Sequence, residues 1–162
     1  MTRLYLVRHG IAVPHGDPGY PDDDRPLTDQ GRSHLRQVGK GLRKLRVQPD
    51  RILTSPLPRA RETAEIVAEA LGLTDALESA DTLRAGNDAA TIRDWLFTLP
   101  AGDLMLVGHN PSLSNLVGLL ITGEHGLPLV ELRKGGVAAF ASGADGGLRL
   151  DWLARPKLLR RI

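Results

Sequence analysis

The chain has 162 residues, enough for one domain that buries about 70% of its unfolded surface without a disulfide or metal. It has no cysteine, which excludes a disulfide scaffold, a thiolate metal site and a cysteine nucleophile. Its 21 basic and 19 acidic residues leave a net charge of +2, too small to predict a nucleic-acid partner. No apolar run approaches the roughly 20 residues that cross a bilayer, and no signal pattern opens the chain. We therefore expect a single domain over residues 1–162, cytoplasmic, with no membrane partner.

The first predicted elements are a strand, a loop and a helix. Residues 4–7 form an apolar run typical of a buried strand. Residues 14–26 are rich in proline, glycine and aspartate, and we interpret them as a loop beside a site. Thr28 is expected to cap a helix, in which Gly39 and Gly41 indicate close packing and no chemistry. The apolar face of this helix consists of Leu35, Val38, Leu42 and Leu45.

The middle of the chain repeats the alternation of strand and helix. A second strand is predicted at residues 51–54, and a second helix ends at Gly72. The apolar face of that helix consists of Ala60, Ala64, Val67 and Leu71. A third helix is expected to start at Asn87 and to stop at Pro100, before a third strand at residues 104–107.

The last third of the chain completes an α/β pattern. A fourth helix is predicted from Pro111 to Gly123, and two strands, at residues 137–141 and 148–153, flank a glycine-rich turn. The basic tail, residues 155–162, is expected to pack through its leucines. This alternation predicts a three-layer αβα fold, with a mostly parallel sheet, helices on both faces and an antiparallel edge from the final strands. Ligands of such sheets bind beyond the carboxyl ends of the strands.

Arginine and histidine gather at that edge of the predicted sheet. Arg8-His9-Gly10 follows the first strand, Ser55-Pro56 and Arg59 follow the second, and His109 follows the third. A single histidine or arginine at a strand end is usually structural or solvated. Two guanidiniums and two imidazoles together predict a pocket for a dianionic tetrahedral group, and a phosphoryl group fits that description.

These motifs also carry a family resemblance. They resemble the histidine phosphatase superfamily in Arg8-His9-Gly10, Ser55-Pro56, Arg59-Ala60, Glu62-Thr63 and Gly108-His109-Asn110-Pro111. The short length, with Asp24-Arg25-Pro26-Leu27-Thr28 followed by Gly31, is similar to the small phosphohistidine phosphatases of the SixA type. The resemblance spans about residues 3–140 and implies a phosphoglycerate mutase-like αβα fold.

The resemblance also implies roles for the four residues. His9 would be the nucleophile that becomes transiently phosphorylated, Arg8 and Arg59 would bind the phosphoryl oxygens, and His109 would bind and assist from the far side. Elementary chemistry agrees, because a neutral imidazole is a competent nucleophile at pH 7 and arginines neutralise phosphoryl oxygens. Arg25 either reaches the rim of the pocket as a substrate-binding residue or pairs with Asp22–Asp24, and the sequence leaves both open.

The sequence predicts no cofactor and no metal, and it assigns no general acid. His15, His34 and His125 share no metal-ligand spacing. Residues 81–86 have no carboxylate at the position where larger members of the superfamily place an acidic proton donor. The remaining candidates, each more often a solvated carboxylate, are Asp17, Asp22, Asp23, Asp24, Glu78, Asp81 and Asp88.

We therefore expect a metal-independent phosphatase that hydrolyses phosphohistidine on proteins through phospho-His9. The short connections after residue 26 leave little chain for a lid, which favours a macromolecular substrate. Two alternatives remain: a small-molecule phosphomonoesterase of the same superfamily, and a non-catalytic phosphate-binding module. The intact set of two arginines and two histidines favours an enzyme, because phosphate binding alone requires no nucleophile.

Overall fold

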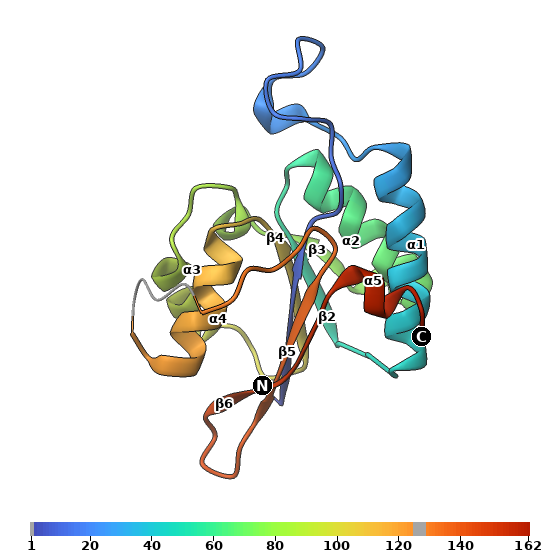
Figure 1. The fold of residues 1–162 in the computed structure, drawn as a ribbon. Coiled ribbons are helices and arrows are strands. Elements are labelled where there is room, and N and C mark those ends of the chain that lie inside the picture. Colours follow the sequence, from blue (N-terminus) through green and yellow to red (C-terminus); the bar gives the residue numbers. More distant parts are fainter. Residues whose placement is uncertain (1, 125–128) are drawn as a thin grey trace.

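The computed structural model describes residues 2–124 and 129–162, and a mixed β-sheet forms its centre (Figure 1). The strand order is β3-β2-β4-β1-β5-β6. The strands are β1 (Arg3–Arg8), β2 (Arg51–Thr54), β3 (Leu77–Ser79), β4 (Leu104–Gly108), β5 (Val137–Ser142) and β6 (Leu148–Ala154). The first four run parallel, whereas β5 pairs antiparallel with both β1 and β6. The predicted mostly parallel sheet with an antiparallel edge is confirmed.

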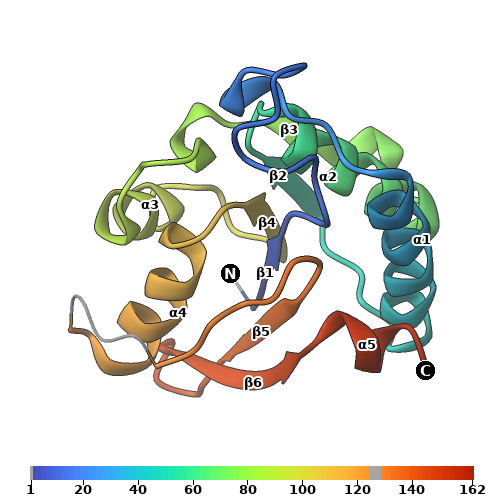
Figure 2. The ribbon, with the colours of Figure 1, turned by 45° about the horizontal axis from the view of Figure 1, so that its top comes forward.

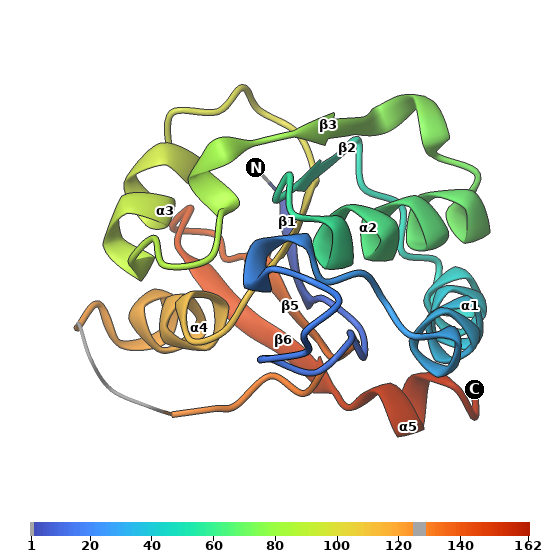
Figure 3. The same ribbon diagram turned by 90° about the horizontal axis from the view of Figure 1, so that it is seen from above.

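Helices cover both faces of this sheet, so the predicted three-layer α/β architecture is also confirmed. The helices are α1 (Asp29–Lys44), α2 (Pro58–Leu71), α3 (Ala89–Leu96), α4 (Ser112–Thr122) and α5 (Pro156–Leu159). Figure 3 shows α3 and α4 on one side of the sheet, and α1, α2 and α5 on the other. Each side has its own apolar core: one includes Ile92 and Leu116, the other Val38 and Val67. Within the described residues, no helix is long and apolar enough to span a membrane.

The register of the parallel strands aligns their carboxyl ends. Arg8 lies opposite Gly108, and Thr54 lies opposite Val107. The backbone N–H of His9 then donates to the Gly108 carbonyl at 3.0 Å, beyond the last paired residues. The residues that follow β1, β2 and β4 therefore emerge at one edge of the sheet, beneath the loop between β1 and α1 (Figure 2).

Helix α1 depends on glycine where the backbone of another segment comes close. A Cβ atom on Gly41 would lie 2.0 Å from the carbonyl oxygen of Leu159, and one on Gly39 would lie 2.5 Å from the Cβ of Ala70. The close packing predicted for both glycines is confirmed. Leu159 is buried against this helix, whereas Leu158 is 58% exposed, so the expectation that the leucines of the tail pack holds for one of the two.

Three elements differ from the sequence-based expectation. The strand β3 was not predicted, because this edge strand has only three residues and exposes Glu78 and Ser79, leaving no apolar run. The short helix α5 was also not predicted. Helix α3 begins at Ala89 and ends at Leu96, which is shorter than expected at both ends. Its start is set by Asp88, whose carboxylate accepts the Thr91 N–H at 2.8 Å.

Candidate active site

A cleft of about 330 Å³ at the carboxyl edge of the sheet brings the predicted site residues together. The four residues that the sequence placed after β1, β2 and β4 all line it: Arg8, His9, Arg59 and His109. Other residues that line it are Pro14, His15, Asp22, Arg25, Ala85, Asn110 and Lys134. The cleft is therefore strongly cationic, and Asp22 provides its carboxylate.

His9 is held in one tautomer by the chain itself. Its Nδ1 lies 2.8 Å from the carbonyl oxygen of Gly10. A carbonyl only accepts hydrogen bonds, so Nδ1 carries the proton and Nε2 keeps its lone pair. Burial lowers the pKa of His9 to about 3, and the positive field of Arg59 and Arg8 acts in the same direction, against the hydrogen bond to Gly10. At neutral pH the ring is uncharged, as a nucleophile requires.

Thr63 connects the loop that carries His9 to the helix that carries Arg59. Its Oγ1 accepts the backbone N–H of Gly10 at 3.0 Å and donates to the Arg59 carbonyl at 2.6 Å. Gly10 is also confined by packing, because a Cβ atom there would lie 2.6 Å from Cδ1 of Leu35. The carbonyl that orients His9 is thus fixed from two directions. Thr63 belongs to the Glu62-Thr63 motif, and its contacts give it a role that the sequence alone does not predict.

Arg8 and Arg59 each leave a buried donor without a partner. Nη1 of Arg8 donates to the Leu132 carbonyl at 2.8 Å, and Nη1 of Arg59 donates to the Asp22 carbonyl at 3.1 Å. The Nε atoms of both arginines are buried and make no hydrogen bond within the described part of the chain. Burial lowers the pKa of both guanidiniums. Buried unpaired N–H groups are costly, so an anion that accepts from them is favoured here.

His109 follows β4, and its ring lies near that of His9. The centroids of the His9 and His109 rings are 5.2 Å apart. Nε2 of His109 is 2.8 Å from Oγ of Ser55, while its buried Nδ1 has no partner among the residues described. Burial, followed by the field of Arg59, lowers the pKa of His109 to about 3. This contact between His109 and the Ser55 hydroxyl is not predicted by the sequence.

Arg25 does both of the things that the sequence left open. Its Nε donates to Oδ1 of Asp22 at 2.7 Å, and its Nη1 donates to the Val13 carbonyl at 2.8 Å. The same side chain lines the cleft. Its role in substrate binding remains a prediction.

Asp22 is the one candidate acid that the structure places in the cleft, as far as its described residues show. Glu78 pairs with Arg51 at 2.8 Å, Asp81 pairs with Arg84 at 2.9 Å, and both lie outside the cleft. Hydrogen bonds from His15 and Arg25 lower the pKa of Asp22. A carboxylate held in its ionised form is a poor proton donor.

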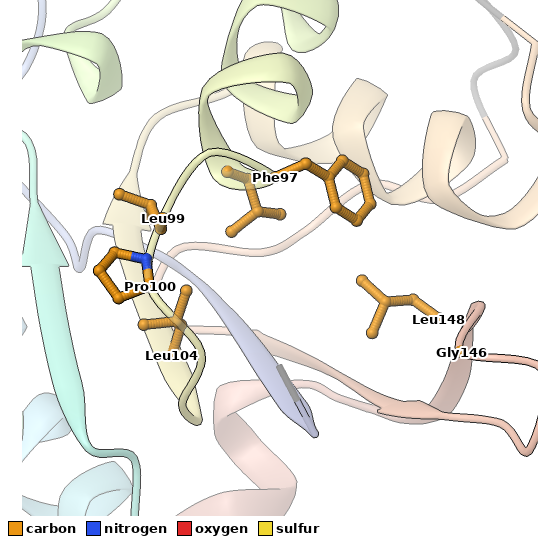
Figure 4. Close-up of a pocket in the computed structure, with 7 residues that line it drawn as sticks. Phe97, Leu99, Pro100, Leu104, Gly146 and Leu148 are labelled. Atoms are coloured by element: carbon orange, nitrogen blue, oxygen red, sulfur yellow. The ribbon is translucent and has the colours of Figure 1, made fainter.

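A second hollow lies at the opposite end of β4 and lacks the chemistry of a phosphoryl site. It lies between the end of α3 and the β5–β6 hairpin (Figure 4). Its lining is Leu96, Phe97, Leu99, Pro100, Leu104, Gly146 and Leu148. None of these side chains is titratable. In addition, no group of three or more potential metal ligands occurs within residues 2–124 and 129–162.

The two buried histidines predict an acid-labile fold. Both have pKa values lowered to about 3, so between pH 6.5 and 3 the unfolded chain binds two protons that the folded chain does not. Stability must fall as pH falls through this window, by about 1.6 kcal/mol per histidine from pH 6.5 to 5. Urea unfolding at both pH values should show this loss, and a His9→Asn, His109→Asn protein should lose about 3 kcal/mol less. An equal loss in the two proteins would contradict the assignment.

Fold and site together define a phosphoglycerate mutase-like α/β protein with a cationic cleft for an oxyanion, and comparison with known proteins specifies the family. The sequence profile of the Histidine phosphatase superfamily (branch 1) matches residues 4–84. The chain belongs to this superfamily.

Individual relatives cover most of the chain. It is 39% identical over 145 residues to an uncharacterised protein of Picosynechococcus, a match spanning 87% of this chain and 86% of that one. It is 29% identical to the phosphohistidine phosphatase SixA of Escherichia coli, over 75% of this chain and 76% of SixA. The structure of the protein histidine phosphatase SixA complexed with tungstate superimposes with a TM-score of 0.83 at 26% identity, covering 97% of this chain and 99% of that one.

Proposed function

We propose that this protein is a metal-independent phosphatase that hydrolyses phosphohistidine on proteins through a phosphorylated His9. The observation that carries the proposal is the uncharged, oriented His9 ring in a cleft where Arg8 and Arg59 have unpaired donors. The similarity to SixA supports the substrate class, and the tungstate in the SixA structure is a tetrahedral oxyanion of the kind such a cleft would hold.

The proposed reaction has two phosphoryl transfers. In the first, Nε2 of His9 attacks phosphorus and the P–N bond to the substrate imidazole breaks. In the second, water attacks the phosphoryl group on His9, the new P–N bond breaks, and phosphate leaves. Arg8 and Arg59 neutralise the equatorial oxygens in both transfers, which is the main demand of a loose phosphoryl transition state. His109 binds the phosphoryl group and assists the transfer from the far side of that group.

The ionised state of Asp22, the carboxylate that lines the cleft, favours phosphohistidine over an alkyl ester. Expelling an alkoxide requires a proton donor, and the ionised Asp22 is a poor one. Transfer from one imidazole to another replaces a P–N bond with a P–N bond of similar energy. It therefore demands less proton donation than cleavage of an alkyl ester does.

The substrate class is tested by comparing a histidine-phosphorylated carrier protein with phosphoserine and sugar phosphates. We expect kcat/KM for the phosphohistidine protein to be at least about tenfold higher than for either alkyl ester. Aryl phosphates have good leaving groups and do not discriminate. A higher kcat/KM for an alkyl ester, together with an essential Asp22, would instead indicate a metabolite phosphatase.

Metal independence is a separate expectation. Arg8 and Arg59 supply the charge that Mg²⁺ or Zn²⁺ supplies in other phosphatases. Release of phosphate should be unchanged by chelators, and vanadate should compete with substrate. Activity that disappears with a chelator and returns with a divalent cation would refute this prediction.

A further inference from the structure

The proposed reaction moves one proton in each transfer. When the P–N bond of the substrate breaks, its imidazole must gain a proton to leave as a neutral ring. When water attacks phospho-His9, the water must lose a proton. One side chain that donates first and accepts second returns to its starting state after each turnover.

Among the described residues that line the cleft, most have side chains that cannot donate a proton and then accept one. The guanidiniums of Arg8, Arg25 and Arg59 do not release a proton in proteins. His9 uses one ring nitrogen for Gly10 and the other for attack. The Nδ1 atom of His109 has no partner among the described residues, but burial lowers the pKa of His109 to about 3, so at neutral pH its ring is uncharged and has no acidic proton to donate. Asp22 already accepts hydrogen bonds as a carboxylate. His15 and Lys134 remain.

Both side chains line the cleft, and His15 is the one that a hydrogen bond orients. Nδ1 of His15 donates to Oδ1 of Asp22, and the same oxygen accepts Nε–H of Arg25 at 2.7 Å. This arrangement holds Nδ1 of His15 against the carboxylate and leaves Nε2 for a reaction partner. By contrast, Lys134 makes no hydrogen bond or ion pair to any residue that the structure describes.

The contacts of Asp22 also connect His15 to the phosphoryl site. The backbone carbonyl of Asp22 accepts Nη1–H of Arg59 at 3.1 Å. Asp22 therefore contacts His15 through its side chain and Arg59 through its backbone. The side chain of His15 is 79% exposed and lines the same cleft as His9. A leaving group that points out of the cleft can therefore reach the ring, whereas His9 stays buried.

From this geometry, and resting on the proposed function, we infer that His15 is the general acid and base of the reaction and that Asp22 is its positioning residue. Nε2–H of His15 passes its proton to the leaving nitrogen as the P–N bond of the substrate breaks and the bond from His9 to phosphorus forms. His15 then accepts the proton of the water that cleaves phospho-His9. The balance is one phosphohistidine and one water converted to one histidine and one phosphate, with His15 restored.

The test uses leaving groups of different basicity, because a general acid matters most where the leaving group is poor. We expect His15→Gln to lower kcat/KM least for 4-nitrophenyl phosphate, whose leaving group needs little proton donation. The same variant should lose about tenfold on a phosphohistidine peptide and about a hundredfold on an alkyl phosphate. Asp22→Asn, which keeps the backbone carbonyl that Arg59 uses, should show the same order with smaller losses. A structural defect would lower all three values equally.

Two matched variants complete the experiment. His34→Gln makes the same replacement outside the cleft and should leave all three values unchanged. Lys134→Gln removes the competing donor. Equal losses of His15→Gln on all three substrates, or a leaving-group dependence that changes in Lys134→Gln instead, would overturn the inference. Failure of the proposed function has a different readout: the unmodified protein would cleave the aryl phosphate but not the phosphohistidine peptide. The two failures are therefore distinguishable.

Discussion

His9→Ala is expected to lower phosphatase turnover by about 10⁴-fold or more while leaving the fold intact. The loss is large because the alanine protein has no covalent route, and the remaining cations of the cleft only bind the phosphoryl group. The fold should tolerate the change, because the buried His9 ring is uncharged at neutral pH and its hydrogen bond is to the adjacent Gly10. Steady-state assay beside circular dichroism measures both effects. An alanine protein that keeps more than a tenth of the activity would exclude His9 as nucleophile.

The intermediate gives a second measurement of the same prediction. Quenching the unmodified protein during turnover should trap phosphate on His9 as an adduct that acid removes and alkali preserves. Peptide mapping locates the label, and the His9→Ala protein is the control that should carry none. A label on Ser55, whose hydroxyl also lies at this edge of the sheet, would reject the assignment.

The position of the site followed from the sequence because it depends on strand ends. Apolar runs at residues 4–7, 51–54 and 104–107 predicted parallel strands, and parallel strands place their carboxyl ends at one edge. The residues after each run therefore had to converge, whatever the details of the loops. The structure brings His9 and His109 to 5.2 Å between ring centroids, as that argument requires.

The contacts that orient the site could not be predicted in the same way. The hydrogen bond from Gly10 to Thr63 joins residues 53 positions apart, and that from His109 to Ser55 joins residues 54 apart. The first depends on how closely helix α2 approaches the Gly10 loop, and the second on the pairing of β2 with β4, which local patterns do not encode. The pairing of His15 with Asp22 likewise depends on the path of an irregular loop. Signals for these residues were weak, since threonine and serine near helix starts usually serve as caps.

The burial of the site residues also could not be predicted from composition alone. Histidine and arginine are usually exposed, yet His9 is 7% exposed and Arg59 is 3% exposed. The sheet edge buries them because α2 begins directly after the loop that follows β2, so its first turn packs over the strand ends. Desolvation then sets the charge of the histidines and leaves the arginines with unpaired donors.

Arg59 should be the second most sensitive position, because its buried guanidinium binds the phosphoryl group and no cation from solvent can take its place. Its guanidinium is buried in the first turn of α2, with Nη1 bound to Asp22 and Nε unpaired within the described residues. In a buried cleft a fixed, charged donor stabilises the developing charge of the transition state far more than it does in water. The neighbouring Arg61 is exposed and pairs with Glu65 at 3.5 Å, so it provides a control on the same helix.

Arg59→Ala is therefore expected to lower kcat/KM by about 10²- to 10³-fold and to weaken competition by vanadate, while Arg61→Ala leaves both within about twofold. Arg59→Lys should recover about tenfold of the loss and no more, because an ammonium is a point charge that cannot reproduce a planar fork of donors. Steady-state kinetics and vanadate inhibition constants of the three variants measure this difference. Complete recovery by lysine would show that only charge is needed at this position. An effect of Arg61→Ala equal to that of Arg59→Ala would show that the loss of activity comes from a change in helix α2 and not from the missing buried guanidinium.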